Sequence, residues 1–198
     1  MRLQRLRQPG RPHRWAVIAC LLAPLLLHGG ASAQDRAAEK PARVEAAFLR
    51  NFARYVSWPA RAFAGERSPW LVCILGENHF DDALEATFHG RTEQGRPFEV
   101  VRGARLDQLP ACQIVFVGLP QAAERRAALA ELKKLPVLTV GHAPQFLDEG
   151  GIIRLLAGER IEMSINLDQA RAASLTIPSK MLEVSREVVE NGMLRKWR

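Results

Sequence analysis

Three short runs of mostly apolar residues, each closed by a glycine, constrain this fold more than any other feature. They cover residues 70–75, 113–117 and 137–140 and end at Gly76, Gly118 and Gly141. Continuous apolar runs of this length indicate strands that are buried on both faces. A segment rich in Ala, Leu and Glu, residues 121–134, separates the last two runs and predicts a helix. Strands that alternate with helices favour a largely parallel sheet with right-handed crossovers.

A helix precedes these strands in the prediction, opening at Pro41 and stopped by Trp58-Pro59. Its apolar face consists of residues that recur at helical spacing: Val44, Phe48, Phe52 and Tyr55. The opposite side carries a stripe of three arginines: Arg43, Arg50 and Arg54. A solvated basic face is the ordinary interpretation of such a stripe, and contact with an acidic partner is the alternative.

The rest of the chain predicts short elements. A helix at residues 81–88 and a strand at 97–101 follow the first apolar run, and helices are expected at 168–173 and 179–190. Two alternating segments, residues 152–156 and 161–165, flank Ala157-Gly158-Glu159-Arg160 and predict an antiparallel hairpin. We therefore expect a single α/β domain over residues 34–198, with an ordered core at about 42–190. Its sheet would be mixed but mainly parallel, with about six strands, flanking helices and a C-terminal antiparallel hairpin.

The first 33 residues differ in composition from the remainder. They hold five of the 28 basic residues and none of the 21 acidic ones, so the formal charge of +7 falls to +2 without them. A nucleic-acid-binding interpretation of the high pI therefore loses its support. An arginine-rich start, an apolar run at residues 15–27 and Ala31-Ser32-Ala33 predict a secretory signal cleaved before Gln34.

A lipoprotein signal is the alternative for the same segment. Val17-Ile18-Ala19-Cys20 resembles a lipoprotein box, which would make Cys20 an acylated anchor. Only five residues separate Arg14 from Cys20, and the apolar run continues past the cysteine. We therefore expect cleavage after Ala33 and an exported protein.

Export leaves two cysteines, Cys73 and Cys112, in an oxidising compartment. We expect a structural disulfide between them, because a redox couple or a metal site would call for a C-x-x-C pair or clustered histidines. Cys73 lies inside one predicted strand and Cys112 directly precedes another. The bond is sterically possible if those strands are neighbours in the sheet.

The search for catalytic or metal-binding motifs is negative. The exported part has three histidines, His79, His89 and His142, and no two share a helix at ligand spacing. His79 lies near Asp81 and Asp82, which suggests a base with an orienting carboxylate or, more simply, a solvated loop with helix-capping acids. We expect no catalytic set, no metal and no cofactor. The basic tail, residues 193–198, suits either a membrane or partner contact or an unstructured end.

Several short motifs together resemble the YfiR-like family of periplasmic proteins. They are Asn51-Phe52, Trp58-Pro59, Cys73-Ile74-Leu75-Gly76, Gly150-Gly151-Ile152, Ile165-Asn166-Leu167 with Ala170, Leu175, Ser179-Lys180 and Leu182. The resemblance spans residues 44–189. The best-studied family arrangement has a second cysteine pair towards the C-terminal half, which this chain lacks, so only Cys73 and Cys112 carry over. Asn51, Trp58 and Asn166 match the family motifs, and a structural role for them is as ordinary as an interface role.

The resemblance implies an exported α/β regulator that represses an inner-membrane diguanylate cyclase by binding its periplasmic portion. Cyclic-di-GMP signalling and biofilm formation would fall as a result. In that scheme an OmpA-like outer-membrane lipoprotein can sequester the regulator, and family members are often homodimers. The alternative is a periplasmic small-molecule sensor that uses the crevice near residues 76–79 and 118–120. An unrecognised hydrolase is a third hypothesis.

Overall fold

The computed structural model describes residues 31–158 and 160–196. The chain divides into two compact units, residues 1–36 and 37–198, and only residues 31–36 of the first are described. The predicted signal segment up to residue 30, with Cys20, lies outside the described residues. The description below concerns the second unit. Among the residues that the structure describes, no helix is long and apolar enough to cross a membrane.

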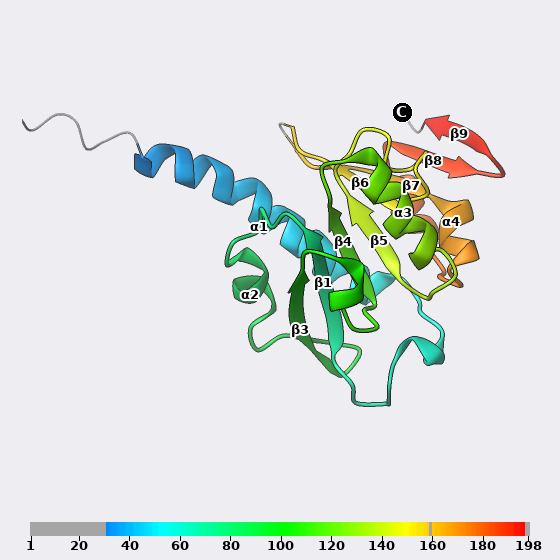
Figure 1. The fold of residues 1–198 in the computed structure, drawn as a ribbon, viewed down its shortest axis with the longest axis horizontal. Helices are drawn as coiled ribbons and strands as arrows, with labels where there is room; N and C mark the ends of the chain where they lie inside the picture. Colours follow the sequence, from blue (N-terminus) through cyan, green and yellow to red (C-terminus); the bar gives the residue numbers. More distant parts are fainter. Residues whose placement is uncertain (1–30, 159, 197–198) are drawn as a thin grey trace, which may run out of the picture. The chain divides into compact units, whose positions relative to one another are not determined.

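The chain alternates helices and strands along most of its length (Figure 1). The helices are α1 (Ala31–Tyr55), η1 (Ala60–Ala62), α2 (Ala83–Phe88), η2 (Leu106–Gln108), α3 (Ala122–Leu132), α4 (Leu167–Ala172) and α5 (Ser179–Glu183). The strands are β1 (Trp70–Gly76), β2 (Thr92–Glu93), β3 (Arg96–Gly103), β4 (Ile114–Gly118), β5 (Leu138–Gly141), β6 (Ile153–Leu156), β7 (Glu162–Asn166), β8 (Glu187–Glu190) and β9 (Met193–Lys196). The α/β class is therefore confirmed.

One mixed sheet contains all nine described strands, in the order β2-β3-β1-β4-β5-β6-β7-β8-β9. Strands β3, β1, β4, β5 and β6 are parallel to one another, and β6 and β7 form the predicted antiparallel hairpin. The six expected strands are present. The expectation of about six was nevertheless wrong, because β2, β8 and β9 extend the sheet at its two edges.

The last predicted helix, residues 179–190, is the largest error. Helix α5 stops at Glu183, and the valine pair that follows lies in β8, where Val188 is buried opposite Ile165 of β7. Asn191 and Gly192 both have positive φ and turn the chain into β9, which is the hairpin geometry that an Asn-Gly pair favours. The tail up to Lys196 is thus an exposed edge strand.

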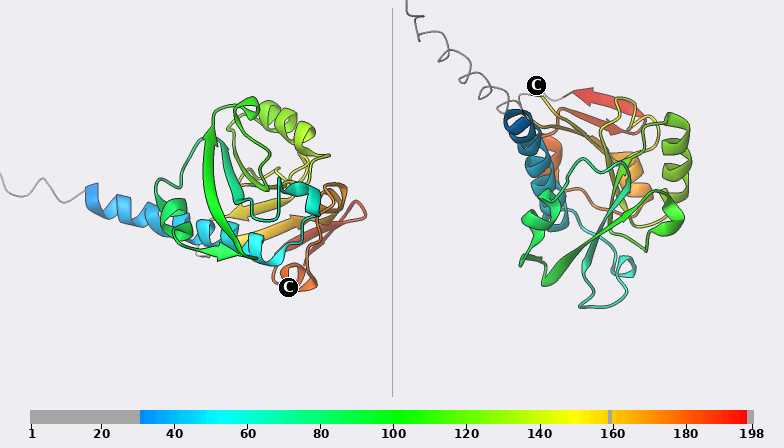
Figure 2. Two further views of the ribbon diagram at one scale, coloured as in Figure 1. Left: turned by 90° about the horizontal axis from the view of Figure 1, so that it is seen from below. Right: turned by 60° about the vertical axis from the view of Figure 1, so that its left-hand side comes forward.

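The sheet separates two apolar cores. Alternate strand residues such as Val72, Ile74 and Phe116 pack with α1, whereas Leu75 and Val117 pack with Leu129 of α3. Figures 1 and 2 show α3 and the part of α1 in this unit on opposite faces of the sheet. The central strands β1, β4 and β5 are buried on both faces, which explains why their sequences lack polar alternation.

Helix α1 differs from its prediction in start and in orientation. It begins at Ala31, and Pro41 lies inside it. Phe52 is buried and Phe48 packs against the core as expected, but Val44 and Tyr55 are 46% and 52% exposed. The fully buried positions of the helix include small residues, Ala46 and Ala53. Alanines allow close contact with the sheet, and a pattern weighted towards large side chains misses them.

The Cys73–Cys112 disulfide is present. Strands β1 and β4 are neighbours, with Val72 opposite Ile114, and the two cysteine Cα atoms are 6.1 Å apart. Both cysteines are buried in the core beneath α3. The bond therefore joins β1 to the segment that leads directly into β4.

Candidate functional site

The strand order creates a crevice at the carboxyl end of the sheet. After β1 the chain crosses to β3 on one side, whereas after the neighbouring strand β4 it continues to β5 on the other side. Loops that leave neighbouring strands in opposite directions open a cleft, where α/β proteins commonly bind ligands. A cavity of about 460 Å³ lies there, between the loops after β1, β4 and β5. It occupies the place predicted from residues 76–79 and 118–120.

Two glycines bring the first two loops together. Gly76 has a φ of +88°, which a glycine adopts without strain. The backbone of the next residue, Glu77, donates a hydrogen bond of 3.1 Å to the carbonyl of Gly118. A side chain at Gly118 would overlap the carbonyl oxygen of Glu77. The cavity wall therefore depends on close backbone approach at these positions.

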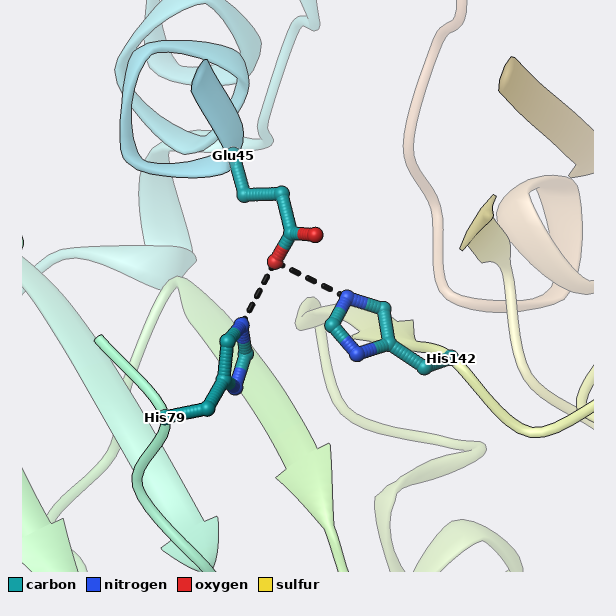
Figure 3. A group of neighbouring side chains, drawn as sticks. All are labelled: Glu45, His79 and His142. Atoms are coloured by element: carbon teal, nitrogen blue, oxygen red, sulfur yellow. Dashed lines mark hydrogen bonds and ion pairs between the residues drawn. The ribbon is translucent and has the colours of Figure 1, made fainter. Parts of the chain in front are cut away.

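Three polar side chains converge beside this cavity (Figure 3). Glu45 comes from α1, His79 follows β1, and His142 follows β5 directly. Glu45 Oε2 lies 2.6 Å from His79 Nε2 and 2.9 Å from His142 Nε2. The two imidazole centroids are 4.7 Å apart. His79 and His142 also line the cavity, so the cluster belongs to its wall.

The carboxylate of Glu45 is the buried member of the cluster. Its side chain is 1% exposed, whereas those of His79 and His142 are 38% and 36% exposed. Burial raises the pKa of Glu45 and is the largest single influence, but interactions with His142 and then His79 outweigh it. The net pKa lies below the ordinary value, so the carboxylate is ionised at neutral pH and accepts the hydrogen bond from His79.

An aromatic wall supports the two imidazoles. The Phe116 ring lies 5.0 Å from His79 and 4.9 Å from His142, centroid to centroid, and Phe80 lies 4.0 Å from His79. Phe80 and Phe116 are themselves buried. The cluster is therefore polar at its centre, apolar around its rim and open to the cavity on one side.

Arg125 holds the loop after β4 in place. Its guanidinium forms two hydrogen bonds of 2.7 and 2.8 Å with Glu149 and donates to the carbonyls of Leu119 and Pro120. Both charged side chains are more than nine-tenths buried. The hydrogen bonds with Arg125 lower the pKa of Glu149 against the effect of burial. This ion pair fixes one wall of the cavity.

The structure places the family-motif residues mainly in structural roles. Trp58 donates from its indole to the carbonyl of Gln113 and packs against Trp70. Asn166 is buried, caps α4 and donates to the carbonyl of Leu147. Gly150 and Gly151 precede β6, and Pro59 precedes η1. Asn51 is exposed on α1.

Two arginines of the predicted stripe contact other side chains, and the acids near His79 lie outside the Glu45 cluster. Arg50 is bound to Glu93 at 2.8 Å, and the Arg54 guanidinium lies over the Tyr55 ring. Asp82 stands at the N-cap of α2 without a side-chain capping bond. The carboxylate that contacts His79 is Glu45, from a different helix. His89 is exposed and lies outside the cluster.

Sequence reasoning missed the cluster because its members come from three separate elements. His142 directly follows a strand end, and His79 follows another after a short loop, which is the signal that could have paired them. No comparable sequence signal marks Glu45. It belongs neither to the predicted apolar face of the helix nor to the arginine stripe on the opposite side.

These features define an α/β protein with a polar crevice at the topological switch of its sheet. A comparison with protein families matches residues 42–186 to the YfiR/HmsC-like family, and the chain belongs to that family. A search of curated proteins found no match. The family and the buried disulfide are both consistent with export.

Proposed function

We propose that this protein is a periplasmic regulatory binding protein that represses an inner-membrane diguanylate cyclase by protein–protein contact. The observation that carries the proposal is the family match across residues 42–186, nearly the whole second unit. The disulfide supports an oxidising compartment. Repression lowers cyclic-di-GMP, and an OmpA-like outer-membrane lipoprotein relieves it by sequestering the regulator.

Contact with the periplasmic portion of the cyclase would use exposed side chains. Arg43 and Arg54 lie on the exposed part of α1, and Arg50 is positioned by its bond to Glu93. Positive charge on one helix face suits an acidic partner surface. A homodimer is part of the same proposal, because β9 is exposed along its length and pairs with β8 alone among the described strands.

The test is capture of the partner. The disulfide-bonded protein is immobilised and exposed to detergent-solubilised inner membranes of its host, and retained proteins are identified by mass spectrometry. We expect a membrane diguanylate cyclase, with capture reduced in the R43E/R54E variant and retained in the E124Q variant, which alters an exposed residue of α3. Folded protein that captures no cyclase would contradict the proposal.

The cavity favours a second function, a periplasmic small-molecule sensor. Its volume of about 460 Å³ is within the range of ligand pockets, and it lies at the topological switch. A thermal-shift screen with amino acids, nucleotides and vitamins tests this. A ligand at 100 times its Kd stabilises the protein by about 2.7 kcal/mol, and a flat screen would count against the sensor.

A further inference from the structure

The cluster at the crevice has the composition of a metal site. Glu45, His79 and His142 each offer one ligand atom, and these atoms lie within 4.8 Å of one another. Two imidazoles and one carboxylate are a ligand set that catalytic zinc sites use. Imidazole nitrogen favours zinc, copper, iron and nickel over magnesium or calcium, which take oxygen ligands.

The spacing of the donor atoms suits a small cation after a slight expansion. With metal–ligand bonds of about 2.0–2.1 Å, ligand atoms of a tetrahedral site are about 3.3 Å apart. The two contacts of Glu45, at 2.6 and 2.9 Å, are somewhat shorter. An ion between the donors would move the Glu45 oxygen and each histidine nitrogen apart by about half an ångström. Both histidines lie on loops beyond strand ends and are partly exposed, so this adjustment needs no change in the sheet.

His142 provides an independent observation. Its Nε2 atom is buried and has no hydrogen-bond partner of acceptable geometry, although it lies 2.9 Å from Glu45. A buried polar atom without a hydrogen bond is unusual in proteins. An imidazole nitrogen in that position is free to direct its lone pair at an ion. Glu45 supplies a nearly fully buried negative charge beside it, which a cation would neutralise.

The surroundings fit a site with an open coordination position. Phe80 and Phe116 pack against the imidazoles and limit the access of water from the sheet side. His79 and His142 line the cavity, so a fourth ligand can approach from there. Three protein ligands with one exchangeable position are typical of zinc sites that bind a further molecule.

We propose that Glu45, His79 and His142 form a binding site for one divalent transition-metal ion of the Zn²⁺ class, with its open position facing the crevice. The proposal is independent of the cyclase, because it concerns the isolated protein. A bound ion would also join α1 to the loops after β1 and β5.

The test measures Zn²⁺ binding by the protein purified from its host without a histidine tag and stripped with a chelator. Equilibrium dialysis with metal analysis should give one Zn²⁺ per chain. The H142A and H79A variants should each lose at least about 100-fold in affinity. H89A is the matched control, because His89 is exposed and outside the cluster, and it should bind like the wild type.

Two further measurements keep the proposal falsifiable. Co²⁺ should give a visible absorption spectrum typical of low coordination in the wild type and in H89A, and H142A should lose it. E45Q keeps the size of the side chain but removes its charge, and circular dichroism establishes that it is folded. Absence of stoichiometric binding, or wild-type affinity in folded H142A or E45Q, would overturn the three-ligand site.

Discussion

Glu45 Oε2 lies 2.6 Å from His79 Nε2, although the two residues are 34 positions apart. This contact ties helix α1 to the carboxyl end of β1, beside the cavity. The same oxygen approaches His142, which follows β5. One buried carboxylate therefore links three elements, and the crevice and the core beneath α1 meet at this point.

Removal of the disulfide should destabilise the protein without changing its fold. The bond closes a sequence separation of 39 residues between two central strands. Loop-closure entropy sets the expected loss at about 2–4 kcal/mol for the C73A/C112A variant. Urea unfolding of the wild type and the variant measures it. A reductant should lower the stability of the wild type alone, and equal stability of both proteins without reductant would refute the prediction.

The buried Arg125–Glu149 ion pair should contribute far more to the unfolding free energy than an exposed ion pair does. E149Q leaves the buried Arg125 guanidinium without its counter-charge, and we expect a loss of about 3 kcal/mol in unfolding free energy. The D107N variant is the control, because Arg105 and Asp107 form an ion pair with both side chains largely exposed. It should unfold like the wild type. Similar losses in the two variants would show that burial does not decide the effect.

The same pair predicts a pH dependence. Because Arg125 lowers the pKa of Glu149, the ionised carboxyl stabilises the fold above its unfolded pKa of about 4.3. This contribution falls as the pH drops through that value towards the lower folded pKa. The stability gap between wild type and E149Q should therefore be full at pH 7 and shrink towards pH 3. Unfolding titrations across this range measure the gap, and a constant gap would contradict the assignment.

A methyl group at Gly118 should disturb the crevice. It would overlap the carbonyl oxygen of Glu77, so G118A should lose about 1–3 kcal/mol. Gly65 is the matched control, because a methyl group there meets no atom within 4 Å. Thermal unfolding compares the two variants. Equal melting temperatures for G118A and G65A would show that the close approach is not needed.

The local sequence pattern was sufficient to predict the central strands of the sheet. The runs that became β1, β4 and β5 are mostly apolar, and burial on both faces explains them simply. The disulfide followed from one cysteine within a strand and another just before the neighbouring strand. By contrast, the helix predicted at residues 179–190 is wrong beyond Glu183, because a helical start at Ser179 outweighed the Asn191-Gly192 turn signal.

The candidate site was less accessible to sequence reasoning. The crevice could be anticipated, since strand ends predict it. The Glu45 cluster could not, because its contacts depend on which face of α1 meets the sheet. That face combines the small Ala46 and Ala53 with the large Leu49 and Phe52, and it leaves Val44 and Tyr55 exposed.

The most direct test of the proposed function is the level of cyclic-di-GMP in the host after deletion of the gene. Repression predicts that cyclic-di-GMP and biofilm rise in the deletion strain and return to normal when the wild-type gene is restored. Deletion of the captured cyclase in the same strain should abolish the rise. Unchanged cyclic-di-GMP and biofilm in the deletion strain would contradict the account.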